Sequence, residues 1–126
     1  MNMNKIKRAV GMAELVLLIF EAKYPNDKIP RKNIKCAKKY LDTQTIGKFN
    51  ALEQASDDML DAYFGGNCIK ETKEWLSIRA IHFACNAVIS SNQEWVVLLG
   101  EKYAERQAIE AIDYAKTCLQ LLIRSK

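Results

Sequence analysis

The chain has 126 residues, of which 49% are hydrophobic and 27% charged, with five glycines and two prolines. This length is typical of one helical or mixed domain, 1–126, with enough buried surface for a core without cross-links. The scarcity of glycine and proline argues against the many tight turns of a β-sandwich or barrel. The net charge of +4 is uneven: residues 1–48 carry eleven basic and four acidic side chains, and residues 49–126 carry eight and eleven.

The first predicted helix spans residues 4–24. Its apolar residues recur at spacings of three and four and also cover much of the opposite face, which predicts a central helix. Pro25 ends it, because proline lacks the N–H that the helix needs. The apolar stretch 9–20 is interrupted by Glu14 and is too short for a membrane span, which needs about 20 residues. No small-residue cleavage site follows it, so we expect no signal peptide.

The second predicted helix, residues 30–41, is strongly basic. Pro30 suits its first turn, where a missing N–H costs nothing. Six basic residues and no acidic one lie between Lys28 and Lys39. On a helix, four of them form one stripe opposite the apolar side. The stripe consists of Arg31, Lys35, Lys38 and Lys39.

Three further helices are predicted. One covers residues 44–64, with Thr43 as N-cap, Ile46 and Leu60 on its buried face, and Gly65-Gly66 as its end. The next covers residues 69–89, capped by Asn67. The last begins at a capping-box spacing from Ser91 to Glu94, carries Leu98 and Leu99 on its apolar stripe, and is kinked or broken at Gly100. No alternating strand pattern occurs, so the expected fold is all-α: a compact bundle of about five to six helices with short loops.

The sequence predicts neither a metal site nor a cofactor nor a catalytic residue. The cysteines are far apart and have no ligand spacing, so they are expected to be reduced core residues: Cys36, Cys68, Cys85 and Cys118. His82, the only histidine, is expected to be a core residue with satisfied hydrogen bonds. No nucleophile elbow or phosphate loop accompanies it.

Two sets of acidic residues are unusual. Glu14 and Glu21 lie seven residues apart on an apolar helix, where a carboxylate needs a partner. An ion pair from Glu21 to Arg31 that fixes the turn is the first interpretation, and a polar pocket at the turn is the second. A stripe on the third helix is expected to offset the lysines of the second helix, with an acidic docking face as its alternative. That stripe consists of Glu53, Asp57 and Asp61.

The segment FEAKYPNDKIPRKNI, residues 20–34, resembles a motif of the immunity-five-like family of bacterial polymorphic toxin systems. The family pattern is approximately F-E-x-x-x-P-x-D-x-R-P-R-x-A-I, and AELVLLIFE resembles its first helix. Ile29 and Asn33 depart from the pattern. The resemblance covers residues 10–45 and implies an all-helical protein that is not an enzyme and that neutralises a toxin. The matching residues are Phe20, Glu21, Pro25, Asp27, Pro30, Arg31 and Ile34.

The sequence therefore predicts a cytoplasmic, non-enzymatic inhibitor of a protein partner, either a toxin or, for a phage protein, a host defence component. Expected partner contacts are Asp27, Arg31, Lys35, Lys38 and Lys39, with Glu21, Pro25 and Pro30 shaping the turn. Alternatives are a nucleic-acid or nucleotide-binding protein that uses the same basic face, a solvated face without a partner, and an enzyme with Glu14 and Glu21 in a cleft. A homodimer is a further alternative, and no membrane partner is expected.

Overall fold

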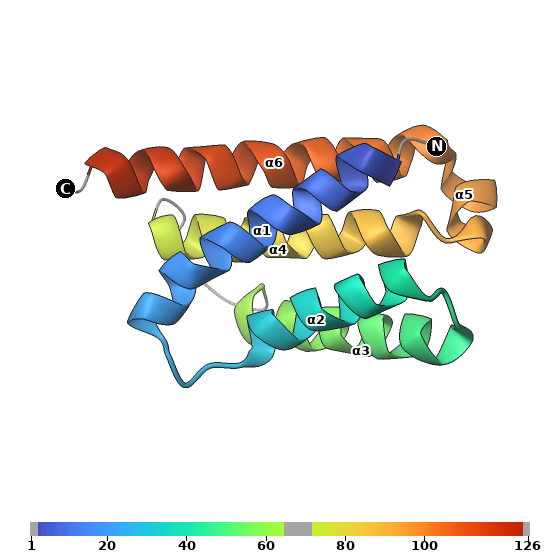
Figure 1. Ribbon diagram of the computed structural model, residues 1–126, viewed down its shortest axis with the longest axis horizontal. Helices are drawn as coiled ribbons and strands as arrows, with labels where there is room; N and C mark the ends of the chain where they lie inside the picture. Colours follow the sequence, from blue (N-terminus) through green and yellow to red (C-terminus); the bar gives the residue numbers. More distant parts are fainter. Residues whose placement is uncertain (1–2, 65–71, 125–126) are drawn as a thin grey trace.

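The computed structural model describes residues 3–64 and 72–124. These ranges contain no strand and six helices: α1 (Met3–Lys23), α2 (Ile29–Asp42), α3 (Ile46–Tyr63), α4 (Lys73–Ser90), α5 (Gln93–Leu99) and α6 (Glu101–Arg124). The predicted all-α bundle of five to six helices is confirmed (Figure 1). None of these helices combines the length and the apolar character that a membrane span requires.

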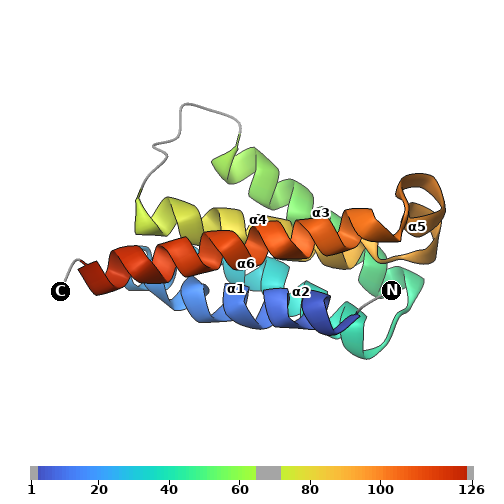
Figure 2. The ribbon, with the colours of Figure 1, turned by 90° about the horizontal axis from the view of Figure 1, so that it is seen from above.

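Helix α4 forms the centre of the bundle. It packs most extensively against α6, then against α1, and it also contacts α2, α3 and α5. Figures 1 and 2 show α1 and α6 lying beside α4, and Figure 1 shows α2 and α3 together along the remaining side. The expectation that α1 is central was wrong, because Leu15 and Leu18 are 51% and 57% exposed on its uncovered side.

Small side chains explain the close packing of α4 and α6. Alanines recur at helical spacing on the buried side of each helix, and helices approach each other closely where the facing side chains are small. The larger core residues come from α1, α2, α3 and α4 itself, including Ile6, Ile34, Leu52 and Ile81. The buried alanines are Ala80, Ala84 and Ala87 in α4 and Ala104, Ala108, Ala111 and Ala115 in α6.

The helix ends differ from prediction at several caps. Thr45 caps α3, since its Oγ1 accepts a hydrogen bond from Lys48 N at 3.3 Å. Thr43 instead terminates α2, where its N–H bonds to Lys39 O. At α5 the cap is Asn92 rather than Ser91: the Asn92 Oδ1 accepts from Glu94 N at 3.0 Å. A threonine or asparagine one or two residues away has the same capping chemistry, so sequence spacing alone did not separate the candidates.

The helix α4 begins later than predicted. Its first residue is Lys73, because the Thr72 side chain accepts a hydrogen bond from Trp75 N and starts the helix there. The predicted cap Asn67 and the predicted helix end at Gly65-Gly66 lie outside the described residues. Gly100 separates α5 from α6 with φ 86, a left-handed conformation that glycine adopts without strain. The predicted break is therefore confirmed.

Candidate protein-binding surface

The turn between α1 and α2 is held by an ion pair. Arg31 donates from Nε to Glu21 Oε2 at 2.7 Å and from Nη2 to Glu21 Oε1 at 2.6 Å. This two-bond contact lowers the pKa of Glu21 and raises that of Arg31, chiefly through the hydrogen bonds. Lys28 Nζ also donates to Pro25 O at 2.8 Å. The interpretation of Glu21 and Arg31 as a structural pair is confirmed.

Asp27 has internal partners as well. Its Oδ1 accepts from Ile29 N at 3.2 Å, and its Oδ2 accepts a short hydrogen bond from the Tyr63 hydroxyl of α3. Burial, and then this bond, raises the pKa of Tyr63. Pro30 is buried, and Phe20 and Ile34 belong to the core. The residues that resemble the family motif therefore build this turn, and Asp27 and Arg31 are engaged within the chain.

A second ion pair extends the first along α1 and α2. Lys38 Nζ lies 2.9 Å from Glu14 Oε2. Glu14 and Glu21 are seven residues apart, as are Arg31 and Lys38, so the two pairs match on antiparallel helices. Of the two carboxylates in the alternative of an enzyme cleft, Glu14 pairs with Lys38 and Glu21 with Arg31. Three exposed lysines of α2 form no ion pair with another described residue: Lys32, Lys35 and Lys39.

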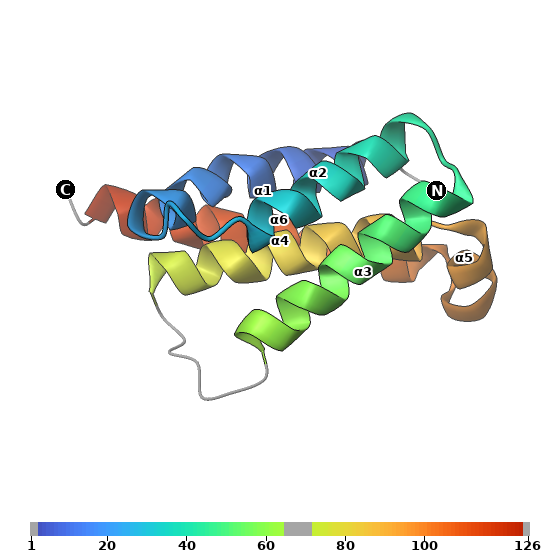
Figure 3. The same cartoon turned by 90° about the horizontal axis from the view of Figure 1, so that it is seen from below.

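A hollow part of the surface lies between α3 and α5, which do not pack directly against each other. Figure 3 shows α3 crossing the face of α4 diagonally, with α5 beyond the end of α4. Two hollows of about 340 and 410 Å³ adjoin here, and both are lined by Glu53 and Trp95. We call them together the α3–α5 groove. At one end, Asn92 Nδ2 donates to the Tyr40 hydroxyl at 2.9 Å.

Apolar side chains that the sequence placed in the core are exposed along this groove. Ile46 is 80% exposed and Leu60 40%, although both were expected on the buried face of α3. Leu98 and Leu99 of α5 are 74% and 45% exposed. All four line the groove. Helix α5, with the sequence QEWVVLL, contains no buried residue. Apolar exposure of this kind marks interaction sites.

The charge of the groove is negative. Its two hollows are lined by the carboxylates Glu53, Asp57 and Glu94 and by no lysine or arginine. Glu53 and Asp57 form no hydrogen bond or ion pair with other described residues. The expectation that they offset the lysines of α2 was wrong: no described ion pair joins α3 to α2, whose paired bases bind α1 instead.

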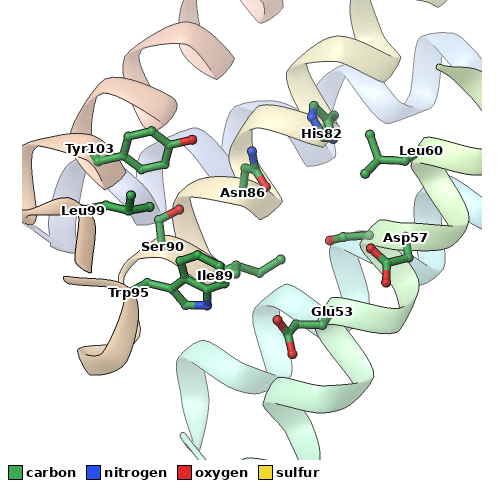
Figure 4. A pocket seen from close by; sticks show the side chains of 11 residues that line it. Glu53, Asp57, Leu60, His82, Asn86, Ile89, Ser90, Trp95, Leu99 and Tyr103 are labelled. Carbon is green, nitrogen blue, oxygen red and sulfur yellow. The ribbon is translucent and has the colours of Figure 1, made fainter. Parts of the chain in front are cut away.

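The floor of the 340 Å³ hollow comes from α4 (Figure 4). Ser90 is only 6% exposed and forms no side-chain hydrogen bond with another described residue. His82 Nδ1 is buried without a hydrogen-bond partner among the described residues. Burial, and then the charge of Arg79, lowers the pKa of His82, so the ring is neutral at pH 7. The expectation of a satisfied histidine was wrong.

This polar floor is not arranged for nucleophilic catalysis. A triad requires hydrogen bonds from the nucleophile to the histidine and from the histidine to a carboxylate. His82, Ser90 and Asp57 form no hydrogen bonds with one another; His82 instead packs on Phe64, with ring centroids 4.8 Å apart. Within residues 3–64 and 72–124, no group of three or more potential ligands is placed to hold a metal ion.

The chain was compared with protein families, curated proteins and solved structures. No family model matches the chain, and no curated protein or solved structure gives a significant match. The resemblance to the immunity-five-like family therefore stays a prediction from residues 10–45.

The groove was not predicted from the sequence, although one feature of α5 indicates it. Between the cap Asn92 and Gly100, α5 has only seven residues, and five of them are consecutive and apolar. Five consecutive residues at 100° each point in all directions around a helix. A short helix at the edge of a bundle cannot bury all of them, so some must face solvent or a partner.

Proposed function

We propose that this chain is a non-enzymatic inhibitor that neutralises a protein partner by binding it through the α3–α5 groove. The partner is a toxin, in keeping with the motif in residues 20–34. The counter-defence alternative has the same surface binding a host defence protein. In both cases the inhibitor acts in the cytoplasm.

The observation that carries this proposal is the exposure of α5. Trp95 and Val96 are partly buried, whereas Val97, Leu98 and Leu99 are exposed. Burial of such apolar area is the main favourable term in protein association. Val97 and Leu98 are each 74% exposed, and Ile46 lies on the opposite wall of the groove. An apolar centre with a polar rim is the usual arrangement of a protein interface.

The negative charge of the groove indicates the charge of the partner surface that it binds. Glu53, Asp57 and Glu94 have no basic counterpart in the lining, so the complementary surface is basic. The unpaired lysines of α2 form a separate positive stripe. We propose this stripe as a second contact, which meets acidic groups of the same partner. It retains Lys35 and Lys39 of the contacts expected from sequence and adds Lys32.

The proposal is tested by growth rescue. The chain is co-expressed with the toxin candidate encoded beside its gene, or with host defence effectors if a phage encodes it. We expect the chain to restore growth and the double variant Ile46→Ser/Leu98→Ser to lose rescue, because it removes two exposed apolar side chains of the groove without touching the core. Ile123→Ser is the matched control, since Ile123 is 72% exposed on α6 and outside the groove.

Binding of the purified proteins by calorimetry accompanies the growth assay, and circular dichroism verifies that each variant is folded. Rescue that survives Ile46→Ser/Leu98→Ser overturns the assignment of the groove as the interface. Absence of both rescue and binding with every toxin candidate and effector overturns the proposed function.

A further inference from the structure

The 340 Å³ hollow of the groove has the features of a binding site for a cationic group. Its volume lies at the lower end of the range for small-ligand sites, roughly 300–1,000 Å³. Figure 4 shows Glu53 and Asp57 on the α3 side, facing Ser90 and Asn86 of α4 across the hollow. Trp95 and Tyr103 lie at the far end.

The carboxylates are one helical turn apart, at i and i+4. Like charges at this spacing repel and destabilise a helix by a few tenths of a kcal/mol. No cation of the described chain relieves this repulsion, since neither side chain has an ion pair there. A bound cation would meet both carboxylates at once.

The floor provides an independent observation that points to a polar ligand. Ser90 is more than nine-tenths buried and points into the hollow, yet its hydroxyl has no partner among the described residues. This hydroxyl is accessible from the hollow and is free to bond a polar group placed there. Asn86 is held in place by its Nδ2, which donates to Gln107 Oε1 at 3.2 Å. The carbonyl oxygen of Asn86 then remains available as an acceptor.

We infer that this hollow binds a guanidinium group, delivered as an arginine side chain of the partner protein. Guanidinium has five N–H donors in a plane and no acceptor, which matches a site of two carboxylates, a hydroxyl and an amide oxygen. Its flat face stacks on aromatic rings, and Trp95 lines the hollow. The source of the arginine rests on the proposed function, but the site itself does not.

The free chain provides the first test. The probe is Nα-acetyl-arginine methylamide, and the neutral control is the citrulline analogue, which has the same shape without the charge. Titrations are followed by ¹H–¹⁵N NMR at the Trp95 indole, which is identified by its loss in Trp95→Phe. We expect saturable shifts with the arginine probe, and binding weaker by about tenfold or more with the citrulline analogue.

A matched pair of variants localises the site. Glu53→Gln/Asp57→Asn removes two charges inside the hollow, and Asp58→Asn/Asp61→Asn removes two from the same helix outside it. We expect the first to weaken probe binding by about tenfold and the second by less than about twofold. Equal effects of the two variants, or equal binding of arginine and citrulline probes, overturn the inference.

The second test uses the partner once growth rescue has identified it. Glu53→Gln/Asp57→Asn should weaken partner binding by about tenfold or more, as loss of a desolvated charge pair does. Probe binding without any effect on the partner overturns the assignment to a partner arginine and leaves a site for a free guanidinium compound. Failure of rescue together with selective probe binding overturns the proposed function and leaves the hollow as a guanidinium site.

Discussion

Arg31 and Glu21 form a bidentate ion pair that joins the end of α1 to the start of α2 across the turn of residues 24–28. The side chains are 33% and 18% exposed, so the pair is only partly screened by water. A carboxylate on the largely apolar α1 is thereby given a fixed partner. The pair gives Arg31 a structural role in the turn.

The first prediction is that this ion pair stabilises the fold by about 1 kcal/mol. The value is at the upper end for surface pairs, because the geometry is bidentate and the side chains are partly buried. A double-mutant cycle with Glu21→Gln and Arg31→Gln, measured by urea unfolding, gives the coupling free energy. Glu14 and Lys38 are the control pair. Their side chains are 40% and 50% exposed, so we expect a coupling of only a few tenths of a kcal/mol.

The Glu21–Arg31 pair also predicts how the stability of the fold changes at acid pH. A lowered pKa in the folded state means that Glu21 contributes stability above its usual pKa, and this stability is lost as pH falls from about 4.5 through the folded-state value. Glu21→Gln should remove that part of the acid dependence. An unchanged profile below pH 4.5, or equal coupling in both pairs, would contradict a special role for the Glu21–Arg31 contact.

The second prediction concerns Tyr63 and Asp27. Tyr63→Phe removes the donor to the Asp27 carboxylate, and hydrogen bonds to charged groups contribute about 1.5–3 kcal/mol. We expect a loss of this size in the free energy of unfolding. Tyr24→Phe is the control: Tyr24 is exposed, its ring packs on Phe20, and its hydroxyl has no described partner. Its loss should stay below about 0.5 kcal/mol.

The fold could be predicted from sequence because its signals are local. The helices follow from the spacing of apolar residues, and Pro25 and Gly100 separate them. The Glu21–Arg31 pair was predicted because only the turn separates the two residues along the chain. Caps were misplaced by one or two residues where several polar side chains compete.

The groove could not be predicted, because it depends on which surfaces the helices leave uncovered. The spacing of apolar residues places Ile46 and Leu98 each on the same helix face as predicted core residues. Whether another helix covers that face depends on how the helices pack. In the sequence, Glu53 is likewise one member of a charged stripe. Its place in the groove depends on α4 and α5, which lie opposite it. The Lys38–Glu14 pair joins residues 24 apart and depends on the antiparallel register of α1 and α2.

The third prediction concerns His82 and pH. Burial favours its neutral form, and Arg79 adds a repulsive charge, so its pKa is lowered in the folded state. The unfolded chain then binds more protons than the folded chain below the ordinary histidine pKa of about 6.5. Stability should therefore be level above that pH and fall as pH decreases through this window. Thermal unfolding at steps from pH 8 to pH 5 measures this.

The variant His82→Phe separates this effect from other titrations. The ring lies against Phe64 and Phe83, so phenylalanine preserves the aromatic contacts without a titrating group. We expect the wild-type decline between about pH 6.5 and 5 to flatten in the variant, while the decline from Glu21 below about pH 4.5 remains. A variant with the same slope as wild type in the upper window would place the titration elsewhere.

The fourth prediction is that neither metal nor disulfide bonds hold the fold. Cys85 is fully buried, and burial raises the pKa of its thiol; burial, and then Glu74, raises the pKa of Cys118 to about 11. Both are therefore protonated at pH 8 and unreactive. Mass spectrometry after alkylation should find them unmodified until denaturant is added. Circular dichroism should not change with chelator or reductant, and unfolding by either would contradict the prediction.

The fifth prediction concerns the unpaired lysines of α2 and decides between a protein and a phosphate ligand. Lys32, Lys35 and Lys39 lie at i, i+3 and i+7, so they form one exposed stripe. If they steer an acidic patch of the partner, replacing all three with glutamine slows association, because exposed charges act mainly on encounter. Dissociation and stability should change little. Surface plasmon resonance at two salt concentrations measures both rates.

The same triple variant is titrated against generic DNA and RNA at low and moderate salt. We expect no measurable nucleic-acid binding by wild type, since three lysines on one helix without an accompanying aromatic platform give few phosphate contacts and nothing on which bases stack. Lys38→Gln is the matched control, because Lys38 is already neutralised by Glu14. Tight, steeply salt-dependent binding that the triple variant abolishes would replace protein docking with phosphate recognition. An association rate unchanged in the triple variant would make the stripe a solvated face and leave the α3–α5 groove as the only proposed contact.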